Sequence, residues 1–278
     1  MTQLLIMMKD AFVLWSTRGG DYMAAAVSYY AIFALVPLIF VSVFIVSQFF
    51  GEALVTRVLL SWGSGMGAGV LMLLQSAVKD LPNSPVLLLA PIGTLTFLLG
   101  AVLIFFTTFT EGLHQLWGYH SEGFSDIVRK TWRALVAVLV LQLFIIGFIA
   151  AEFSFTLMLQ GAILRSYALA GMYIVALSVL FTLCYSLLPL GNKPALASRI
   201  YGATIAAALF SLGKSTVTIH IALTPVPDLF GAAGIAVVLV LWVYVSVSFV
   251  YYGAAFAHVH DKRRRLLEHV DDVVIEAV

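Results

Sequence analysis

The sequence predicts an all-α membrane protein whose single domain, residues 1–278, is a polytopic bundle of six transmembrane helices. Two observations lead to this prediction. Of the 278 residues, 62% are hydrophobic and only 10% are charged, whereas soluble domains average about 45–50% and about 25%. The charged residues also lie between long apolar runs. Each run is long enough for a helix that crosses about 30 Å of hydrocarbon.

The apolar runs define the predicted spans, which are residues 23–50, 86–115, 132–159, 167–188, 200–221 and 232–257. The first carries no formal charge between Asp21 and Glu52. Pro37 removes a backbone donor in the middle of this span, which is tolerated where neighbouring groups satisfy the freed carbonyl. We therefore expect a kinked, protein-facing helix with Pro37 as its hinge.

The N-terminal residues 1–20 are predicted to form a helix that lies in the membrane interface. Leu4, Met8, Phe12 and Trp15 share one helical face, as in interfacial amphipathic helices. The charges of this segment follow a short apolar run, and no small-residue cleavage site comes after them. Because a cleaved signal peptide has the opposite order, we expect the segment to be retained.

Residues 52–84 are expected to lie on the extracytoplasmic side, between the first two spans. Their apolar part, residues 58–75, is of marginal length for a span and contains four glycines at alternate positions. Each glycine weakens a helix by up to about 1 kcal/mol. We interpret this part as an amphipathic or re-entrant segment, with a true span as the alternative.

The distribution of positive charge orients the bundle. With six spans, one side holds eleven of the 15 lysine and arginine residues, including the clusters at 129–133 and 262–265. The positive-inside rule then places both termini in the cytoplasm. A seventh span at 58–75 would move the first cluster outside, so six spans are preferred. The tail, residues 258–278, is predicted to be a short cytoplasmic helix.

Charged side chains within spans are candidates for function, because charge is expensive in lipid. Glu152 and Lys214 both fall in the outer halves of their spans, where they are predicted to pair or to face a common water-filled cavity. The alternative is that both reach the far interface. Glu111 and His114 lie one turn apart at the cytoplasmic end of the second span, where they form either a polar entrance or an interfacial cap.

Other polar residues are assigned smaller roles. Gln142 is expected to make an interhelical hydrogen bond, and the hydroxyls of Tyr29 and Tyr30 are candidates for lining a substrate path. Between the fifth and sixth spans, a tight extracytoplasmic turn is predicted from Pro225, Pro227, Asp228 and Gly231.

No metal, cofactor or nucleic-acid partner is predicted. His258 and His260 are two residues apart, so on a helix they point about 200° apart and do not form a metal site with Asp261. The sequence LGKST at 212–216 lacks the leading glycine of a phosphate-binding loop and lies in a span. Cys184 is the single cysteine, which excludes a disulfide within one chain.

Four segments in this order and spacing resemble the YihY/BrkB (ribonuclease BN-like) family of bacterial inner-membrane proteins. They are AAAVSYYAIFALVPL (24–38), the region 105–117, LPLGNKPALASRIYGATIAAALFSLGK (188–214) and FGAAGIAVVLVLWVYVSVSFVYYGAAFAHV (230–259). The resemblance covers residues 21–258 and implies six transmembrane helices, both termini inside, and a role in envelope biology with lipid-type substrates.

The sequence departs from that family pattern at two places. The final motif, Gly-Ala-Glu in the family, reads Gly253-Ala254-Ala255 here, and Ala34 stands where the family has a serine before the first-span proline. The ribonuclease label is disfavoured, because the sequence has no metal cluster and no basic RNA-binding face.

These observations favour a transporter or flippase for an amphipathic, anionic envelope substrate, with membrane lipids as partners. The main alternative is a non-transporting scaffold for envelope partners, or one that forms homo-oligomers through small-residue faces such as Ala203 and Ala207. A hydrolase is the least favoured function. The predicted location is the bacterial inner membrane.

Overall fold

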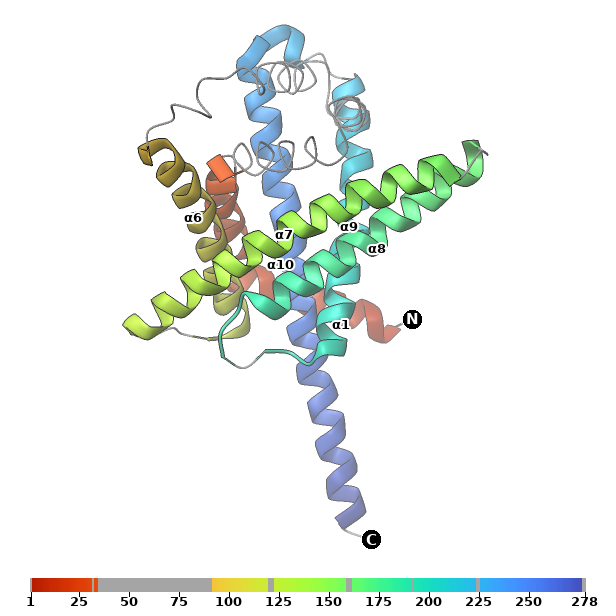
Figure 1. Ribbon diagram of the computed structural model, residues 1–278. Coiled ribbons are helices and arrows are strands. Elements are labelled where there is room, and N and C mark those ends of the chain that lie inside the picture. The colour runs from red at the N-terminus through yellow and green to blue at the C-terminus, as the bar shows by residue number, and fades with distance from the viewer. Residues whose placement is uncertain are drawn as a thin grey trace.

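The computed structural model describes residues 2–31, 33–34, 92–119, 123–158, 162–191, 193–223 and 226–276. Within these ranges the chain is helical except for short connections (Figure 1), so the all-α prediction is confirmed there. The labelled helices are α1 (Thr2–Thr17), α6 (Ile92–Trp117), α7 (Phe124–Met158), α8 (Ala162–Leu187), α9 (Leu196–Leu223) and α10 (Val226–Glu276). A further helical stretch covers 20–31 and 33–34.

Four helices of the described chain are long and apolar enough to cross a membrane. They comprise Ser125–Ala151, Tyr167–Leu187, Leu196–Gly213 and Val240–Glu268, which correspond to the third to sixth predicted spans. The second span is described as helix from Ile92 onward, and the first only as far as residue 34. Pro37 and residues 52–84 lie outside the described residues, so the six-span count and the orientation of the termini stay predictions.

Two helices extend beyond the spans that were predicted for them. The third helix begins at Phe124 rather than near residue 132, so the basic residues at 129–133 lie on α7 itself. The tail predicted at 258–278 continues the helix of the sixth span as far as Glu276, because α10 runs without interruption for 51 residues. No proline or glycine follows Gly253, and the alanine, leucine, arginine and glutamate residues there favour helix. The end of α10 consequently extends past the rest of the described chain (Figure 1).

The turn predicted before the sixth span is shorter than expected. Pro227, Asp228 and Gly231 lie within α10, which begins at Val226, whereas Pro225 is outside the described residues. A proline in the first turn of a helix removes a backbone donor that has no intrahelical partner in any case. Pro227 therefore permits a helix start where a longer irregular turn was predicted.

The core forms where α9 and α10 run against each other. A side chain on Gly202 would collide with the carbonyl oxygen of Gly253, and one on Gly253 would lie within 2.5 Å of the carbonyl oxygen of Gly202. Glycine at both positions lets the two backbones come this close. Ala203 and Ala207 are fully buried in the same chain, so the small-residue face proposed for oligomerisation is already occupied within one protomer.

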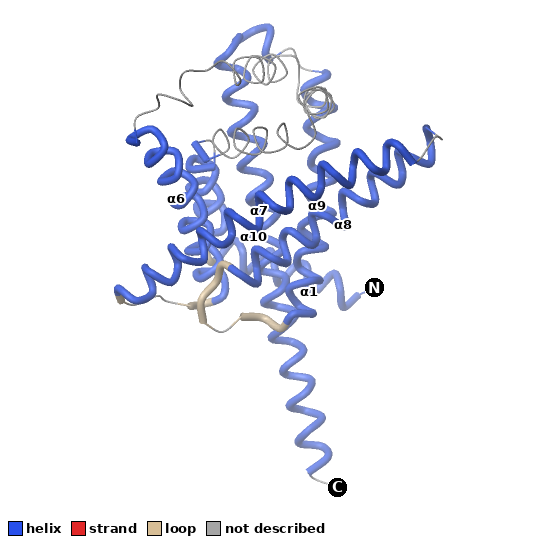
Figure 2. The backbone as a smooth tube through the Cα atoms, viewed as in Figure 1, coloured by secondary structure: helices blue, strands red, loops and turns tan. Residues whose placement is uncertain are grey.

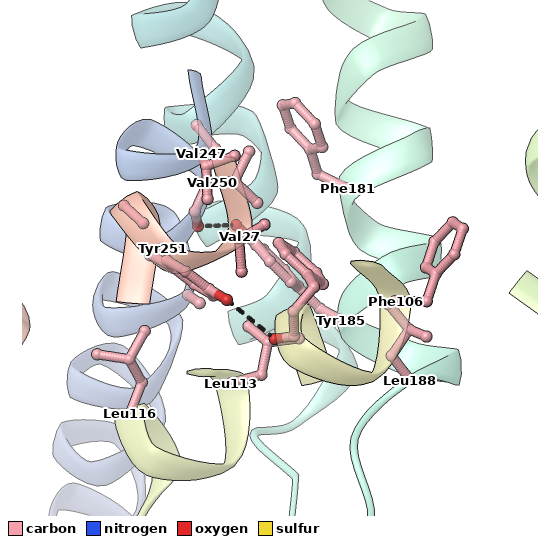
Figure 3. Packing of buried hydrophobic residues seen from close by; sticks show 14 of the residues in the cluster. Val27, Phe106, Leu113, Leu116, Phe181, Tyr185, Leu188, Val247, Val250 and Tyr251 are labelled. Atoms are coloured by element: carbon pink, nitrogen blue, oxygen red, sulfur yellow. Dashed lines mark hydrogen bonds between the residues drawn. The ribbon is translucent and has the colours of Figure 1, made fainter. Parts of the chain in front are cut away.

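Two tyrosines connect this pair of helices to α6 and α8. The hydroxyl of Tyr251 donates to the carbonyl oxygen of Phe109 on α6 at 3.1 Å, and Tyr185 of α8 donates to the carbonyl oxygen of Val250, as Figure 3 shows. Both tyrosine side chains are completely buried. A buried hydroxyl needs a partner, and here each one finds it on a neighbouring helix. These bonds set the relative positions of α6, α8 and α10.

The N-terminal helix is confirmed, and it packs across α10 (Figure 1). Tyr252 of α10 donates to the carbonyl oxygen of Met8 at 2.9 Å. On the predicted apolar face, Leu4 and Phe12 are exposed, whereas Met8 and Trp15 are half-buried. The exposed part of this face suits a membrane interface, a location that stays a prediction.

Candidate functional site

Charged and polar side chains gather at the end of the bundle from which α10 extends. Here the end of α6, the start of α7 and the connection 188–195 between α8 and α9 come together, and Figure 2 shows this connection as a loop there. We call this region the loop end. It contains Glu111 and His114 of the predicted polar patch.

His114 anchors the connection between α8 and α9. Its side chain is 1% exposed, and its Nε2 accepts a hydrogen bond from the backbone N–H of Leu190 at 2.8 Å. Because Nε2 is the acceptor, a neutral His114 carries its proton on Nδ1. That nitrogen lies 3.9 Å from the Oε2 atom of Glu111. The imidazole ring also packs edge-on against Tyr119, with centroids 4.8 Å apart.

Glu111 pairs with a cation on the next helix. Its Oε2 atom lies 2.6 Å from the Nζ atom of Lys130 on α7. The carboxylate is 57% exposed, whereas the lysine is 12% exposed. The charged pair thus lies at the edge of the bundle, with water access from the carboxylate side.

The connection 188–195 is held by several further contacts. Arg133 of α7 donates to the carbonyl oxygen of Pro189. Gly191 has a φ of +74°, and a side chain there would collide with the ring of Tyr119. Glycine is the residue that adopts this backbone conformation without strain. Tyr119 in turn donates to Asp126 of α7 at 3.3 Å, which joins the connection to the start of α7.

Lys193 lies partly desolvated in the same connection, beside two further cations. It donates to the carbonyl oxygen of Ser186 at the end of α8. Burial, with the charges of Arg133 and Arg199, lowers the pKa of Lys193 from 10.5 to about 8. Desolvation and like charges both disfavour the ammonium form. An anion bound here would offset the repulsion that Lys193 experiences from Arg133 and Arg199.

The start of α9 is capped by a side chain from α10. Asp261, 5% exposed, accepts from the backbone N–H of Ala195 at 2.8 Å and from the hydroxyl of Ser198 at 3.3 Å. Its second oxygen pairs with Arg265 at 2.9 Å. An aspartate satisfies the unpaired N–H groups at a helix start. His260 contacts the hydroxyl of Ser198 at 2.9 Å. His260 and Asp261 of α10 therefore both hold this helix against the start of α9.

A family model described as "Virulence factor BrkB" matches residues 11–272. The chain belongs to the BrkB family. It is 28% identical over 262 residues to a "UPF0761 membrane protein" of Alcanivorax borkumensis, covering 88% of this chain and 59% of that relative. It is also 34% identical over 100 residues to a "UPF0761 membrane protein" of Yersinia pseudotuberculosis, covering 36% of this chain and 34% of the relative.

The match establishes a membrane protein of the BrkB family and confirms the resemblance found in the sequence. The chain spans about three fifths of the length of the first relative and about a third of the second. No solved structure matches the chain. Ala255, where the BrkB pattern was expected to carry glutamate, is fully buried in the structure, so this chain has no carboxylate to satisfy at that point.

The other predicted site residues of this BrkB-family chain are not brought together by the described structure. Glu152 and Lys214 lie on α7 and α9, but their side chains lie outside the described part, so their common cavity stays a prediction. Tyr29 is 60% exposed and packs against Tyr30 and Phe33. Gln142 is buried, and its interhelical hydrogen bond stays a prediction.

Sequence reasoning missed three residues of the loop end: Lys193, Arg199 and Asp261. Lys193 and Arg199 were counted only as charges that orient the bundle, and Asp261 only as a rejected metal ligand. One signal was available for the first two, because they flank the Pro194-Ala195 start of a span. No sequence signal showed that a residue of the last helix caps α9.

The His114–Leu190 hydrogen bond predicts a specific loss of stability. In His114→Leu, the buried N–H of Leu190 loses its acceptor, and unfolding free energy should fall by about 1–3 kcal/mol. His114→Gln, which restores an acceptor, should recover part of the loss. The measurement is unfolding of the purified protein by SDS titration. The neighbouring exposed residue provides a control, since Gln115→Ala should change stability by less than about 0.5 kcal/mol; equal losses in both variants would contradict the assignment.

Proposed function

We propose that the protein is a transporter or flippase that moves an amphipathic, anionic envelope substrate across the bacterial inner membrane. In this proposal the loop end faces the cytoplasm, in keeping with the lysine and arginine residues gathered there. The observation that carries the proposal is the combination of a charged, partly desolvated loop end with an exposed apolar surface on the helix that leads away from it.

The apolar surface lies along α7. Trp132, Leu139 and Leu143 fall on one helical face and are 67%, 65% and 70% exposed. Lys130, the partner of Glu111, lies on the same helix within one turn of Trp132. A charged group followed by an apolar stripe matches the form of a molecule with an anionic head and hydrocarbon tails.

At the loop end, Lys130 supplies a cation for an anionic head, and its partner Glu111 supplies a carboxylate that can accept a proton. Glu111 and Lys130 form a pair open to water at the bundle edge, and His114 lies directly behind it. Proton-accepting groups beside a substrate path allow coupling to a proton gradient. Glu152 and Lys214 would line the deeper part of the path in the second halves of α7 and α9, and Pro37 would supply the hinge.

The test is lipid movement in proteoliposomes. Purified full chain is reconstituted with a fluorescent phosphatidylglycerol, and its appearance in the opposite leaflet is followed by dithionite quenching. Wild-type protein should accelerate the movement over empty liposomes. Glu152→Ala, Lys214→Ala and Lys130→Gln should each slow it at least about tenfold, the effect of losing one charge-assisted contact.

Arg264→Gln is the matched control, because Arg264 is exposed and pairs with Glu268 in the extension of α10. Its rate should equal that of wild type. If the reconstituted protein moves no lipid, the transport proposal is wrong. If it moves lipid but all three site variants keep the wild-type rate, the residues named for the path are wrong.

A non-transporting scaffold is the second candidate. It is favoured by the close contact of Gly202 and Gly253, which leaves no room for a side chain between α9 and α10 at that point. A scaffold would predict folded, membrane-inserted protein with no lipid movement in the same assay. Its oligomerisation would need a surface other than Ala203 and Ala207, since both are buried.

A further inference from the structure

Three cations from three different elements surround the connection 188–195 at the loop end. They are Arg133 from α7, Lys193 from the connection itself, and Arg199 from the first turn of α9. We call these residues the basic trio. Arg133 donates to the carbonyl oxygen of Pro189, and Lys193 to that of Ser186, so both side chains are held against the same short stretch of backbone.

The basic trio is under-compensated by negative charge. No described carboxylate lies within 4.0 Å of any of the three charged groups. Asp261 is the carboxylate that attracts the Arg199 guanidinium electrostatically. Its oxygens already accept from Ala195 and Ser198 and pair with Arg265. Partly buried like charges without a counter-charge raise the free energy of the folded state.

Arg199 adds an independent observation. Its Nε atom is buried and has no hydrogen-bond partner in the described part of the chain. A buried guanidinium N–H without an acceptor is rare, because the loss of its hydration is not repaid. The partly desolvated Lys193, whose pKa is lowered to about 8 by burial and by the two arginines, shows the same shortage of negative charge.

We propose that the basic trio is a binding site for a phosphate anion, supplied by the headgroup of an anionic membrane lipid. The chemistry follows from the donors: guanidinium groups bind phosphate oxygens in a fork geometry, and an ammonium group adds a point charge. The depth follows from the helices, since the apolar segments Ser125–Ala151 and Leu196–Gly213 both begin at this end. Lipid phosphates lie at the ends of transmembrane segments.

The proposal does not depend on transport, because a scaffold would bind a lipid headgroup here equally well. It is tested by binding rather than by lipid movement. Full-length protein in a neutral detergent is titrated by calorimetry with dioctanoyl phosphatidic acid, with inorganic phosphate, and with dioctanoyl phosphatidylcholine. Phosphatidic acid should bind saturably and the zwitterionic lipid more weakly.

Lys193→Gln and Arg199→Gln should each raise the dissociation constant for phosphatidic acid roughly tenfold. Lys193→Arg, which keeps the charge, should bind within about threefold of wild type. Arg129→Gln is the matched control, since Arg129 lies one turn from Arg133 on α7 but is 69% exposed and lies beside Asp126. Circular dichroism identifies any variant that fails to fold, and the other trio variant then carries the test.

The three ligands separate the sources of the phosphate. Binding of phosphatidic acid much tighter than inorganic phosphate supports a lipid headgroup, and comparable affinities, both lowered by the trio variants, would assign the site to a free phosphate anion instead. Absence of saturable binding by either ligand would overturn the proposal. An equal loss in Arg129→Gln and Lys193→Gln would also overturn it, because general surface charge would then explain the binding.

Discussion

Replacing Gly202 by leucine is expected to destabilise the fold by about 3 kcal/mol. The reason is the contact between α9 and α10, where a side chain on Gly202 meets the carbonyl oxygen of Gly253, the Cβ of Ala257 and the backbone nitrogen of Ala257. Two of these atoms are backbone, so they cannot move aside without moving a helix. Tyr185 and Tyr251 form hydrogen bonds that join α10 to α8 and α6. A displacement of α10 would therefore also strain these two hydrogen bonds.

The measurement is unfolding by SDS titration, together with the yield of monodisperse protein in size-exclusion chromatography. Gly147→Leu is the matched control. Gly147 is also inside a long apolar helix, but a side chain there meets no atom within 4 Å. Its stability should stay within about 1 kcal/mol of wild type. Equal losses of stability in Gly202→Leu and Gly147→Leu would show that α9 and α10 do not approach closely at Gly202.

Asp261→Ala is expected to lower the free energy of unfolding by about 2–3 kcal/mol. The substitution leaves the N–H of Ala195 without its acceptor at the start of α9, and removes the second partner of Ser198. It also leaves Arg265 without its partner. The effect is large because the carboxylate is almost fully buried and links two helices that are far apart in sequence.

Two companion variants separate the contributions to this loss. Asp261→Asn keeps an oxygen acceptor for Ala195 and should show an intermediate loss. Arg265→Gln removes the ion pair with Asp261 and leaves the helix cap in place. Because the Arg265 side chain is 52% exposed, this variant should lose less than about 1 kcal/mol of unfolding free energy. Stability is again followed by SDS titration. A larger loss for Arg265→Gln than for Asp261→Ala would show that the ion pair, and not the helix cap, is the main contribution.

The helices could be predicted from the sequence because their determinants are local. Uninterrupted apolar runs such as 167–188 predict a membrane helix by length alone, and the structure places a candidate span at Tyr167–Leu187. The contact of Glu111 with His114 followed from their spacing on a helix. Boundaries were less accurate: Phe124 and Val226 begin helices earlier than hydropathy indicated, since charged residues and a first-turn proline are compatible with helix.

The partners of the polar residues could not be predicted in the same way. Glu111 was expected to act with His114, and the structure adds Lys130 of the next helix at 2.6 Å. Lys193 and Arg199 appeared only as charges on one side of the membrane until the fold brought them beside Arg133. Asp261 appeared as an unsuitable metal ligand, and the structure shows it as the cap of α9.

The sequence by itself determined that this is a helical membrane protein of the BrkB type, because apolar length and the order of motifs are properties of the chain alone. Only the tertiary structure decided which charges meet at the loop end and which helices touch at Gly202 and Gly253. The physical reason is range. Helix formation depends on residues three or four apart, whereas charge pairs and backbone contacts between helices depend on how distant segments pack.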